Sequence, residues 1–317
     1  MRKVLLGILA LFILAGIAAC VNSARYTSHI EEAHPASGNV LRVNGADVHV
    51  LTAGSAGPPV MMIHGASANA REFEHTLAPR LSSSHRVLMV DRPGHGHSGR
   101  LADAETLGVQ AAQAAGALEQ LAPGEKAVIV GHSFGGGVAL RLALDRPELV
   151  SGLVLLAPVS HDWGSGGGAW YNKYAGPPVI GHAFTQLLPI VGPQTVKSGI
   201  HGVFDPEPAP DGYFENSAIG LLFRPSNFRA NARDVNALRS ELAAQQTRYP
   251  QLEMPIIVYS GAQDTVLNPA LHVGKLKDQA QDLTLVKLPD GGHMPHHAHA
   301  ENVADDISRL AQGGSAQ

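Results

Sequence analysis

The sequence predicts an α/β protein with a mostly parallel central sheet and helices on both faces. Short, uninterrupted apolar runs recur along the chain, and stretches with helical spacing of apolar residues separate them. Residues 87–90 and 127–130 are clear examples, because every side chain in them is apolar. Strands that are buried on both faces need such runs. Their alternation with helices is typical of a parallel sheet.

The expected elements follow one another in a regular order. Asn44-Gly45 lies between two short apolar segments and predicts a β-hairpin over residues 41–51. Further strands are expected over residues 60–63, 87–90, 127–130, 153–156, 255–259 and 283–288, and helices over residues 71–81, 106–121, 138–144 and 298–310. Pro123-Gly124 and Pro147 each stop a preceding helix.

One long segment interrupts this order. Residues 160–249 are rich in Gly, Pro and aromatic residues, include both tryptophans and contain no clear strand. We interpret this segment as an insertion that lies over the sheet. The core domain is then expected to comprise residues 40–159 and 250–312, followed by a short tail over residues 313–317.

Composition excludes several classes of protein. Apolar residues make up 44% of the 317 residues and charged residues 16%, which suits a folded domain with a real core. Lys and Arg total 23 against 27 Asp and Glu, so a nucleic-acid partner is not expected. Cys20 is the single cysteine, which excludes an intramolecular disulfide and a zinc site built from several cysteines.

The N-terminus carries a targeting signal. Arg2 and Lys3 precede an apolar run over residues 4–19, a pattern that indicates export. Ile-Ala-Ala-Cys at residues 17–20 resembles the lipobox of bacterial lipoproteins, which implies cleavage before Cys20 and lipid on this residue. A plain signal peptide and an uncleaved anchor are the open alternatives. The run over residues 4–19 is only slightly shorter than the about 20 residues that a membrane-spanning helix needs. We assign residues 1–20 to the signal and 21–39 to a tether, and expect the protein on a bacterial membrane, facing the periplasm or the cell exterior.

The strongest chemical signal surrounds Ser133. Gly131-His132-Ser133-Phe134-Gly135 matches the G-x-S-x-G pattern, follows a strand and opens a helix. A sharp turn of this kind exposes the serine hydroxyl, and its glycines remove side chains that would collide. The pattern predicts a nucleophilic serine, although a glycine-rich turn without catalytic use is its simpler alternative.

An aspartate and a histidine later in the chain also follow predicted strands. Asp264 comes after the strand over residues 255–259, and His293 comes after the last strand. The chain order Ser133, Asp264, His293, with each residue just after a strand, resembles the order and placement of the α/β-hydrolase triad. Asp162, which follows the strand over residues 153–156, is a rival acid, and we favour Asp264 by its position.

Together these motifs resemble the α/β-hydrolase family, over about residues 39–312. Residues 91–98, with the pattern D-x-P-G-x-G-x-S, are similar to the lidded subgroup that includes esterases, carbon–carbon bond hydrolases, epoxide hydrolases and haloalkane dehalogenases. The resemblance implies the α/β-hydrolase fold with a helical cap inserted after the sixth strand. It also implies Ser133 as nucleophile, His293 as general base, Asp264 as its partner, and an oxyanion hole from the backbone N–H groups of Ala66 and Phe134.

The type of nucleophile narrows the chemistry. Epoxide hydrolases and haloalkane dehalogenases of this fold carry an aspartate at the elbow, where this chain carries Ser133. A serine attacks a carbonyl carbon, so we expect a carboxylic ester as substrate and an acyl-enzyme intermediate. Open alternatives are a carbon–carbon bond hydrolase of vinylogous diketones, an amidase or acyltransferase, and a hydrolase-like binding protein without turnover.

Several residues are expected to support the site. His64, Gly65, His132 and Trp163 are expected to contact the substrate, and Asp91 and His95 to fix a nearby loop through hydrogen bonds. Ser67 is a further candidate donor near the oxyanion hole. Arg224, Arg229 and Arg233 in the insertion either hold a substrate carboxylate or face solvent. We expect no cofactor.

Histidines gather near the end of the chain. His293, His296, His297 and His299 lie within seven residues, a composition that suggests metal binding. We favour the alternative that His293 belongs to the triad and the other three begin an exposed helix. No metal is therefore expected.

Overall fold

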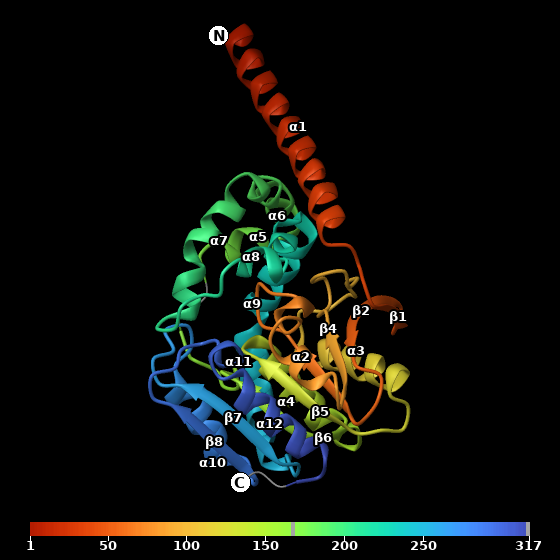
Figure 1. Ribbon diagram of the computed structural model, residues 1–317. Coiled ribbons are helices and arrows are strands. Elements are labelled where there is room, and N and C mark those ends of the chain that lie inside the picture. Colours follow the sequence, from red (N-terminus) through yellow and green to blue (C-terminus); the bar gives the residue numbers. More distant parts are fainter. Residues whose placement is uncertain (166–168, 315–317) are drawn as a thin grey trace.

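The computed structural model describes residues 1–165 and 169–314. Within these residues one eight-stranded sheet has the order β1-β2-β4-β3-β5-β6-β7-β8 (Figure 1). Its strands are β1 (Asn39–Val43), β2 (Ala46–Ala53), β3 (Pro59–Ile63), β4 (Arg86–Val90), β5 (Ala127–His132), β6 (Val150–Leu156), β7 (Ile256–Gly261) and β8 (Leu283–Leu288). β2 pairs antiparallel with β1, in the predicted hairpin, and with β4, and the other pairs are parallel. The predicted α/β class is confirmed.

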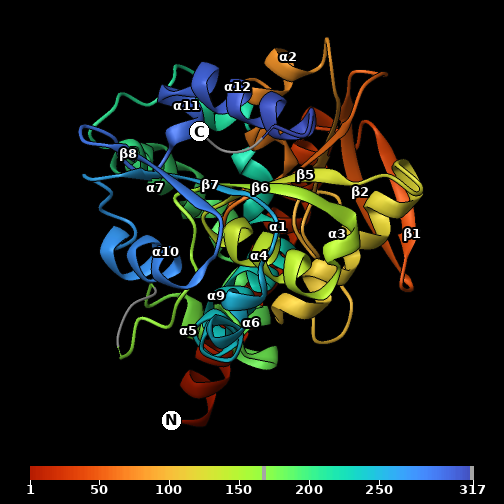
Figure 2. The ribbon, with the colours of Figure 1, turned by 90° about the horizontal axis from the view of Figure 1, so that it is seen from below.

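Helices cover both faces of the sheet (Figure 2). α3 (Leu107–Leu121) and α4 (Phe134–Asp145) pack on one face, and α2 (Leu77–Leu81) and α12 (Ala300–Ala311) on the other. Alternate residues of β3 enter the two cores, Met61 on the α3 side and Met62 on the α12 side. This two-sided burial is the reason why the central strands are apolar throughout.

The short helical segments complete the core domain. They are α10 (Lys275–Gln279), α11 (Pro295–Ala298), the 3₁₀ segments η1 (Ala70–Glu72), η2 (Pro147–Leu149) and η4 (Gln246–Gln251), and the π segment η5 (Ala270–Gly274). The helix expected over residues 71–81 is divided into η1 and α2. The Ala70 N–H donates to the Asp91 carboxylate (2.7 Å), which ties the start of this segment to the loop after β4 instead of to a continuous helix.

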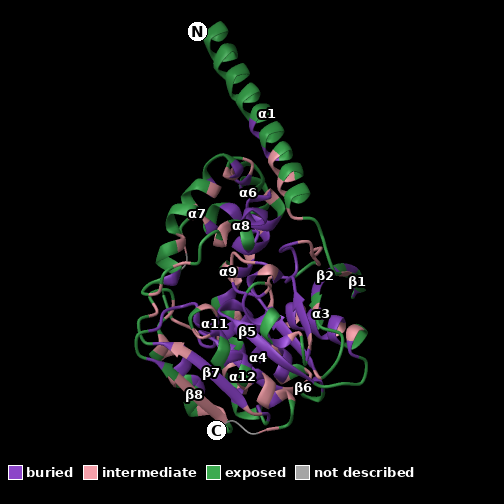
Figure 3. Ribbon diagram, in the orientation of Figure 1, coloured by how far each residue is buried: buried purple, intermediate pink, exposed green. Residues whose placement is uncertain are grey.

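The insertion after β6 forms a helical cap, as predicted (Figures 1 and 3). It contains α5 (Asn172–Ala175), α6 (Pro178–Thr185), α7 (Leu188–Phe204), α8 (Tyr213–Asn216), η3 (Ile219–Phe223) and α9 (Pro225–Gln245). The buried Asp234 carboxylate of α9 accepts hydrogen bonds from Arg92 (2.9 Å) and Arg100 (2.9 Å) of the core domain. This ion-pair network fixes α9 against the loop that follows β4.

The N-terminal region is one helix, α1 (Arg2–Ala33), which is long and apolar enough to cross a membrane. Its first half projects away from the rest of the molecule and is exposed (Figure 3). The predicted tether is helical as far as Ala33, and it packs on the cap: Tyr26 Oη–H donates to the Gly220 carbonyl (3.0 Å), and Arg224 pairs with Glu31 (2.6 Å). At the other end, residues 315–317 of the expected tail lie outside the described residues.

Candidate active site

The backbone at Ser133 forms a tight elbow between β5 and α4. Ser133 has φ 49° and ψ −114°, in a region that side-chain-bearing residues rarely adopt. Its N–H donates to the Leu156 carbonyl (2.9 Å), which ties the elbow to β6. A Cβ on Gly131 would collide with the Gly135 backbone, and one on Gly135 with the Ile63 carbonyl oxygen. Both glycines of the motif are therefore needed for this turn.

The loop after β3 lies against the elbow. A Cβ on Gly65 would lie 3.3 Å from the Ser133 Cβ, so this backbone passes beside the serine. Phe134 is the first residue of α4, where backbone N–H groups lack an acceptor within the helix. Ser67 has φ 60°, and its N–H donates to the Asn231 side chain of α9 (2.7 Å). The segment around Ala66 is thus held between the elbow and the cap.

Asp264 and His293 meet at the carboxyl ends of β7 and β8. His293 Nδ1–H donates to Asp264 Oδ2 (2.8 Å), and both side chains are buried. Asp264 Oδ1 accepts the N–H groups of Val266 (2.8 Å) and Leu267 (2.9 Å), which orients the carboxylate. Asp162, the rival acid, instead accepts the Gly164 N–H (2.9 Å) and lies 3.8 Å from Arg239. The geometry therefore pairs His293 with Asp264.

Burial governs the pKa of His293. Desolvation lowers this pKa below its usual value, the hydrogen bond to Asp264 opposes the shift, and the nearby His132 lowers the pKa further. Burial likewise acts to raise the pKa of Asp264, but its bond to His293 outweighs that effect and lowers the pKa. The pair therefore consists of a neutral imidazole and a carboxylate at neutral pH.

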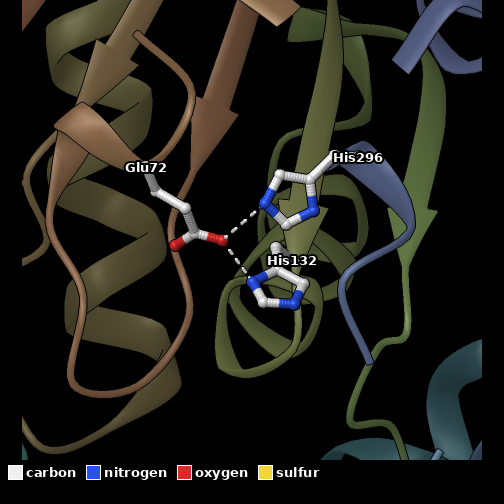
Figure 4. A group of neighbouring side chains, drawn as sticks. All are labelled: Glu72, His132 and His296. Atoms are coloured by element: carbon white, nitrogen blue, oxygen red, sulfur yellow. Dashed lines mark ion pairs between the residues drawn. The ribbon is translucent and has the colours of Figure 1, made fainter. Parts of the chain in front are cut away.

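A second buried group of titratable side chains lies behind the elbow (Figure 4). The Glu72 carboxylate of η1 makes a direct ion pair with His132 Nδ1, and its Oε1 lies 3.2 Å from His296 Nε2. Glu72 Oε2 accepts the Gly65 N–H (3.1 Å). Sequence patterns did not single out Glu72, because it belongs to no motif and approaches His132 only through the fold. The expectation that His296 begins an exposed helix is wrong: its side chain is fully buried, since α11 packs inward beside Phe73.

The contacts of His132 define its charge. Its Nδ1 faces a carboxylate, and its Nε2–H donates to the His293 carbonyl oxygen (3.1 Å), which can only accept. Both ring nitrogens therefore carry protons, and the ring is an imidazolium. Burial opposes this charge, but Glu72 raises the pKa of His132 above its usual value. The ion pair thus joins the Gly65 loop, the elbow and the His293 loop.

The same group supplies the residues that could hold a metal ion. Glu72, His132 and His296 each offer a ligand atom, and these atoms lie within 4.8 Å of one another. The direct contact between Glu72 and His132 leaves no room for an ion between them as the side chains stand. Of the four clustered histidines, only His296 belongs to this group.

Three other predicted residues support the loops. His64 is fully buried, with its Nδ1–H donating to the Gly65 carbonyl (2.8 Å) and its Nε2 accepting the Arg92 N–H (3.0 Å). Burial lowers the pKa of His64 to about 4, so the ring is neutral. Asp91 accepts bonds from His49 (2.6 Å) and from the backbone of Ala70 and His97, the loop-fixing role expected for it. His95 reaches the Pro93 carbonyl (3.2 Å) in the same loop.

Trp163 and the three cap arginines, which were all candidates for substrate contact, lie in separate parts of the structure. The half-buried Trp163 packs on the core beside His272, in the segment that follows Asp264. Arg224, Arg229 and Arg233 line a cavity of about 760 Å³ between the end of α1, the loop at residues 94–100 and α9. None of the residues that line this cavity belongs to the predicted triad.

The fold and this site define an α/β hydrolase. A family model described as the alpha/beta hydrolase family matches residues 60–306, and the chain belongs to that family. A 2-hydroxymuconate semialdehyde hydrolase of Pseudomonas sp. (strain CF600) is 43% identical over 104 residues, which cover 32% of this chain and 36% of that protein. An esterase of Mycobacterium tuberculosis (strain ATCC 25618 / H37Rv) is 36% identical over 118 residues, 37% of this chain and 38% of the esterase. The chain thus matches little more than a third of either relative.

A solved structure resembles the chain over nearly its whole length. It is a membrane phospholipase A, described as a bacterial virulence factor, with a TM-score of 0.70 and 21% identity. The match covers 99% of each chain, so it includes the region of α1. At this identity the likeness concerns the fold.

Proposed function

We propose that the protein is a serine hydrolase that cleaves carboxylic esters with Ser133, His293 and Asp264. The observation that carries this proposal is the 2.8 Å bond from His293 to Asp264. The backbone of the same histidine loop is bonded to His132, the residue before Ser133. These two contacts support a hydrolytic triad of Ser133, His293 and Asp264.

The proposed mechanism assigns each proton. Asp264 holds the proton of His293 on Nδ1, which leaves Nε2 to take the proton of the Ser133 hydroxyl. The serine oxygen then attacks the ester carbonyl carbon, and the N–H groups of Ala66 and Phe134 stabilise the resulting oxyanion. His293 returns the proton to the leaving alcohol, and an acyl-enzyme remains. Water, activated by the same histidine, releases the acid and restores the serine.

The supporting residues acquire distinct roles in this proposal. Gly65 and Trp163 contact the substrate. His64 and His132 position the loops from behind, because the ring nitrogens of both already bond to protein groups.

The test is ester hydrolysis by the full-length protein in detergent, with p-nitrophenyl esters of increasing chain length. Ser133→Ala abolishes turnover if the proposal holds. A folded wild-type protein that hydrolyses none of these esters would count against it. Labelling by a fluorophosphonate then separates an unusual substrate, such as an amide or an acyl-transfer pair, from an idle triad in a binding protein.

A second candidate is hydrolysis of a carbon–carbon bond in a vinylogous diketone. The local identity of 43% to a 2-hydroxymuconate semialdehyde hydrolase favours it. Such substrates carry a carboxylate, yet the three cap arginines line a cavity apart from the triad residues. Loss of dienol absorbance on incubation with such a diketone would support this reaction over ester cleavage.

We also propose that α1 holds the protein on a membrane, with the catalytic domain outside the cytoplasm. Cys20 is exposed on α1, as acylation at this position requires. If lipid on Cys20 supplies the attachment, the intact mass of the protein extracted from membranes corresponds to a chain that begins at Cys20 and carries acyl groups. An unmodified chain that keeps residues 1–19 indicates an uncleaved α1 anchor instead.

A further inference from the structure

We propose that the tip of the cap, residues 174–191, inserts into the surface of a lipid bilayer beside α1. The proposal rests on the membrane attachment proposed above and adds a second contact between protein and membrane. This contact fixes the catalytic domain against the bilayer. The substrates are then long-chain esters that reside in the membrane.

The amino-acid sequence of the cap tip is unusual for a surface segment. No Asp, Glu, Lys or Arg occurs between Lys173 and Lys197. This stretch folds into α6 and the first turns of α7 instead of one long helix. Short helices of this kind cannot span a bilayer, but they can lie in its interface with their apolar sides in the lipid.

Several apolar side chains of the tip are exposed, whereas Phe184 and Leu188 pack inside the cap. Val179 is 82% exposed, Ile180 58%, and Ile190 and Val191 57% each. Aromatic residues border them: the exposed Trp170 packs edge-on against Tyr174 (6.0 Å between ring centroids). Apolar side chains flanked by Trp and Tyr are typical of segments that contact the membrane interface.

Packing of α1 on the cap sets the height of the tip relative to the membrane. The apolar part of α1 reaches Val21, after about 18 residues or 27 Å of helix, close to the thickness of the hydrocarbon core. Buried positions on α1 begin at Ala19 and Ser23, where the helix meets the cap. The membrane boundary on α1 therefore falls where α1 meets the cap, and Figure 1 shows α6 and the start of α7 at that level.

A bilayer fits this face better than a second copy of the protein. The exposed apolar surface of α1 needs lipid around it, and the tip lies at the side of the molecule from which α1 projects (Figure 3). The same holds if the chain is cut before Cys20, because lipid on that residue brings the bilayer to the level of Cys20, next to the point where α1 meets the cap. No residue among 1–165 and 169–314 covers the four exposed side chains.

Trp170 is a built-in reporter for this contact. The chain has two tryptophans, so Trp170 is the single tryptophan in the variant Trp163→Phe. The full-length variant is reconstituted into vesicles of phosphatidylcholine and phosphatidylglycerol, with or without a brominated phosphatidylcholine. Bromine quenches only nearby tryptophans, so we expect quenching of Trp170. The complementary variant Trp170→Phe, which reports on Trp163, should remain unquenched.

A charged double variant tests whether the tip itself makes the contact. Val179→Asp with Ile190→Asp places two carboxylates in the proposed apolar surface at exposed positions, where the fold tolerates them. In the Trp163→Phe background we expect the double variant to lose Trp170 quenching. With Trp163 retained, we expect the double variant to hydrolyse a long-chain ester in vesicles about tenfold more slowly than the wild type. Val203→Asp is the matched control, because Val203 is an exposed apolar residue (40%) on α7 about 18 Å further along the helix than Val191.

The readouts distinguish this inference from the proposed function. Hydrolysis of a short water-soluble ester reports the triad and should be equal in the wild type, the double variant and the control. If that hydrolysis fails in the wild type, the proposed function fails, while quenching still reports the contact. Absence of Trp170 quenching in the Trp163→Phe protein with an unaltered tip overturns the inference. So does a dimer that cross-links through the tip and disappears in the double variant.

Discussion

Replacement of Asp264 by Asn probes the triad at its best-defined contact. Asp264 Oδ1 accepts two backbone N–H groups, and Oδ2 accepts the His293 Nδ1–H. In Asp264→Asn the amide oxygen keeps the backbone bonds, so the NH₂ group faces Nδ1. That nitrogen must then act as acceptor, and the ring proton moves to Nε2. A histidine in this tautomer cannot take the serine proton.

The expected loss is about 10³–10⁴ in kcat/KM, the size reported for a triad with the wrong tautomer, or about 4–5.5 kcal/mol of transition-state stabilisation. Steady-state hydrolysis of a p-nitrophenyl ester measures it, with circular dichroism to check the fold. Asp162→Asn is the matched control, because Asp162 contacts Gly164 and Arg239 instead of His293. A large loss in the control and little loss in Asp264→Asn would refute the assignment.

Three further expectations follow from the surroundings of the triad. In a pH profile, kcat/KM falls on the acid side through a pKa below 6.5, because burial favours the neutral, active form of His293. His132→Gln removes a nearby cation, so the pKa of His293 rises and the acid side of the profile moves to higher pH. Glu72→Gln leaves the His132 imidazolium without its carboxylate and lowers the free energy of unfolding in urea by about 3 kcal/mol. Gly135→Ala meets the Ile63 carbonyl and lowers this free energy by about 2 kcal/mol, whereas Gly199→Ala, with open space around it in α7, does not lower it.

Much of the fold was predictable because the strands are buried on both faces. Each segment predicted as a strand lies in the sheet, and the segment without a clear strand forms the cap. The predicted helix over residues 71–81 was only partly correct, since Ala70 is bonded to Asp91 from a different part of the chain. Local periodicity cannot detect a bond of this kind.

The candidate site likewise contains residues that the sequence predicted and residues that only the folded structure brings together. Ser133, Asp264 and His293 each follow a strand, and parallel strands bring such positions to one edge whatever the details of packing. Glu72 and His296 were missed because their contacts cross between loops that approach each other only in the folded protein. The packing of α1 on the cap was equally inaccessible, because a signal-like sequence carries no information about what it touches.

Covalent labelling tests the central claim most directly. The full-length wild-type protein is treated with a fluorophosphonate, and the adduct is located by mass spectrometry of the digested protein. A reactive serine predicts one adduct per chain, on the peptide that contains Ser133, and none in Ser133→Ala or after acid treatment that protonates His293. A folded protein that takes up no label, or takes it up at another residue, would contradict the account of Ser133 as an activated nucleophile.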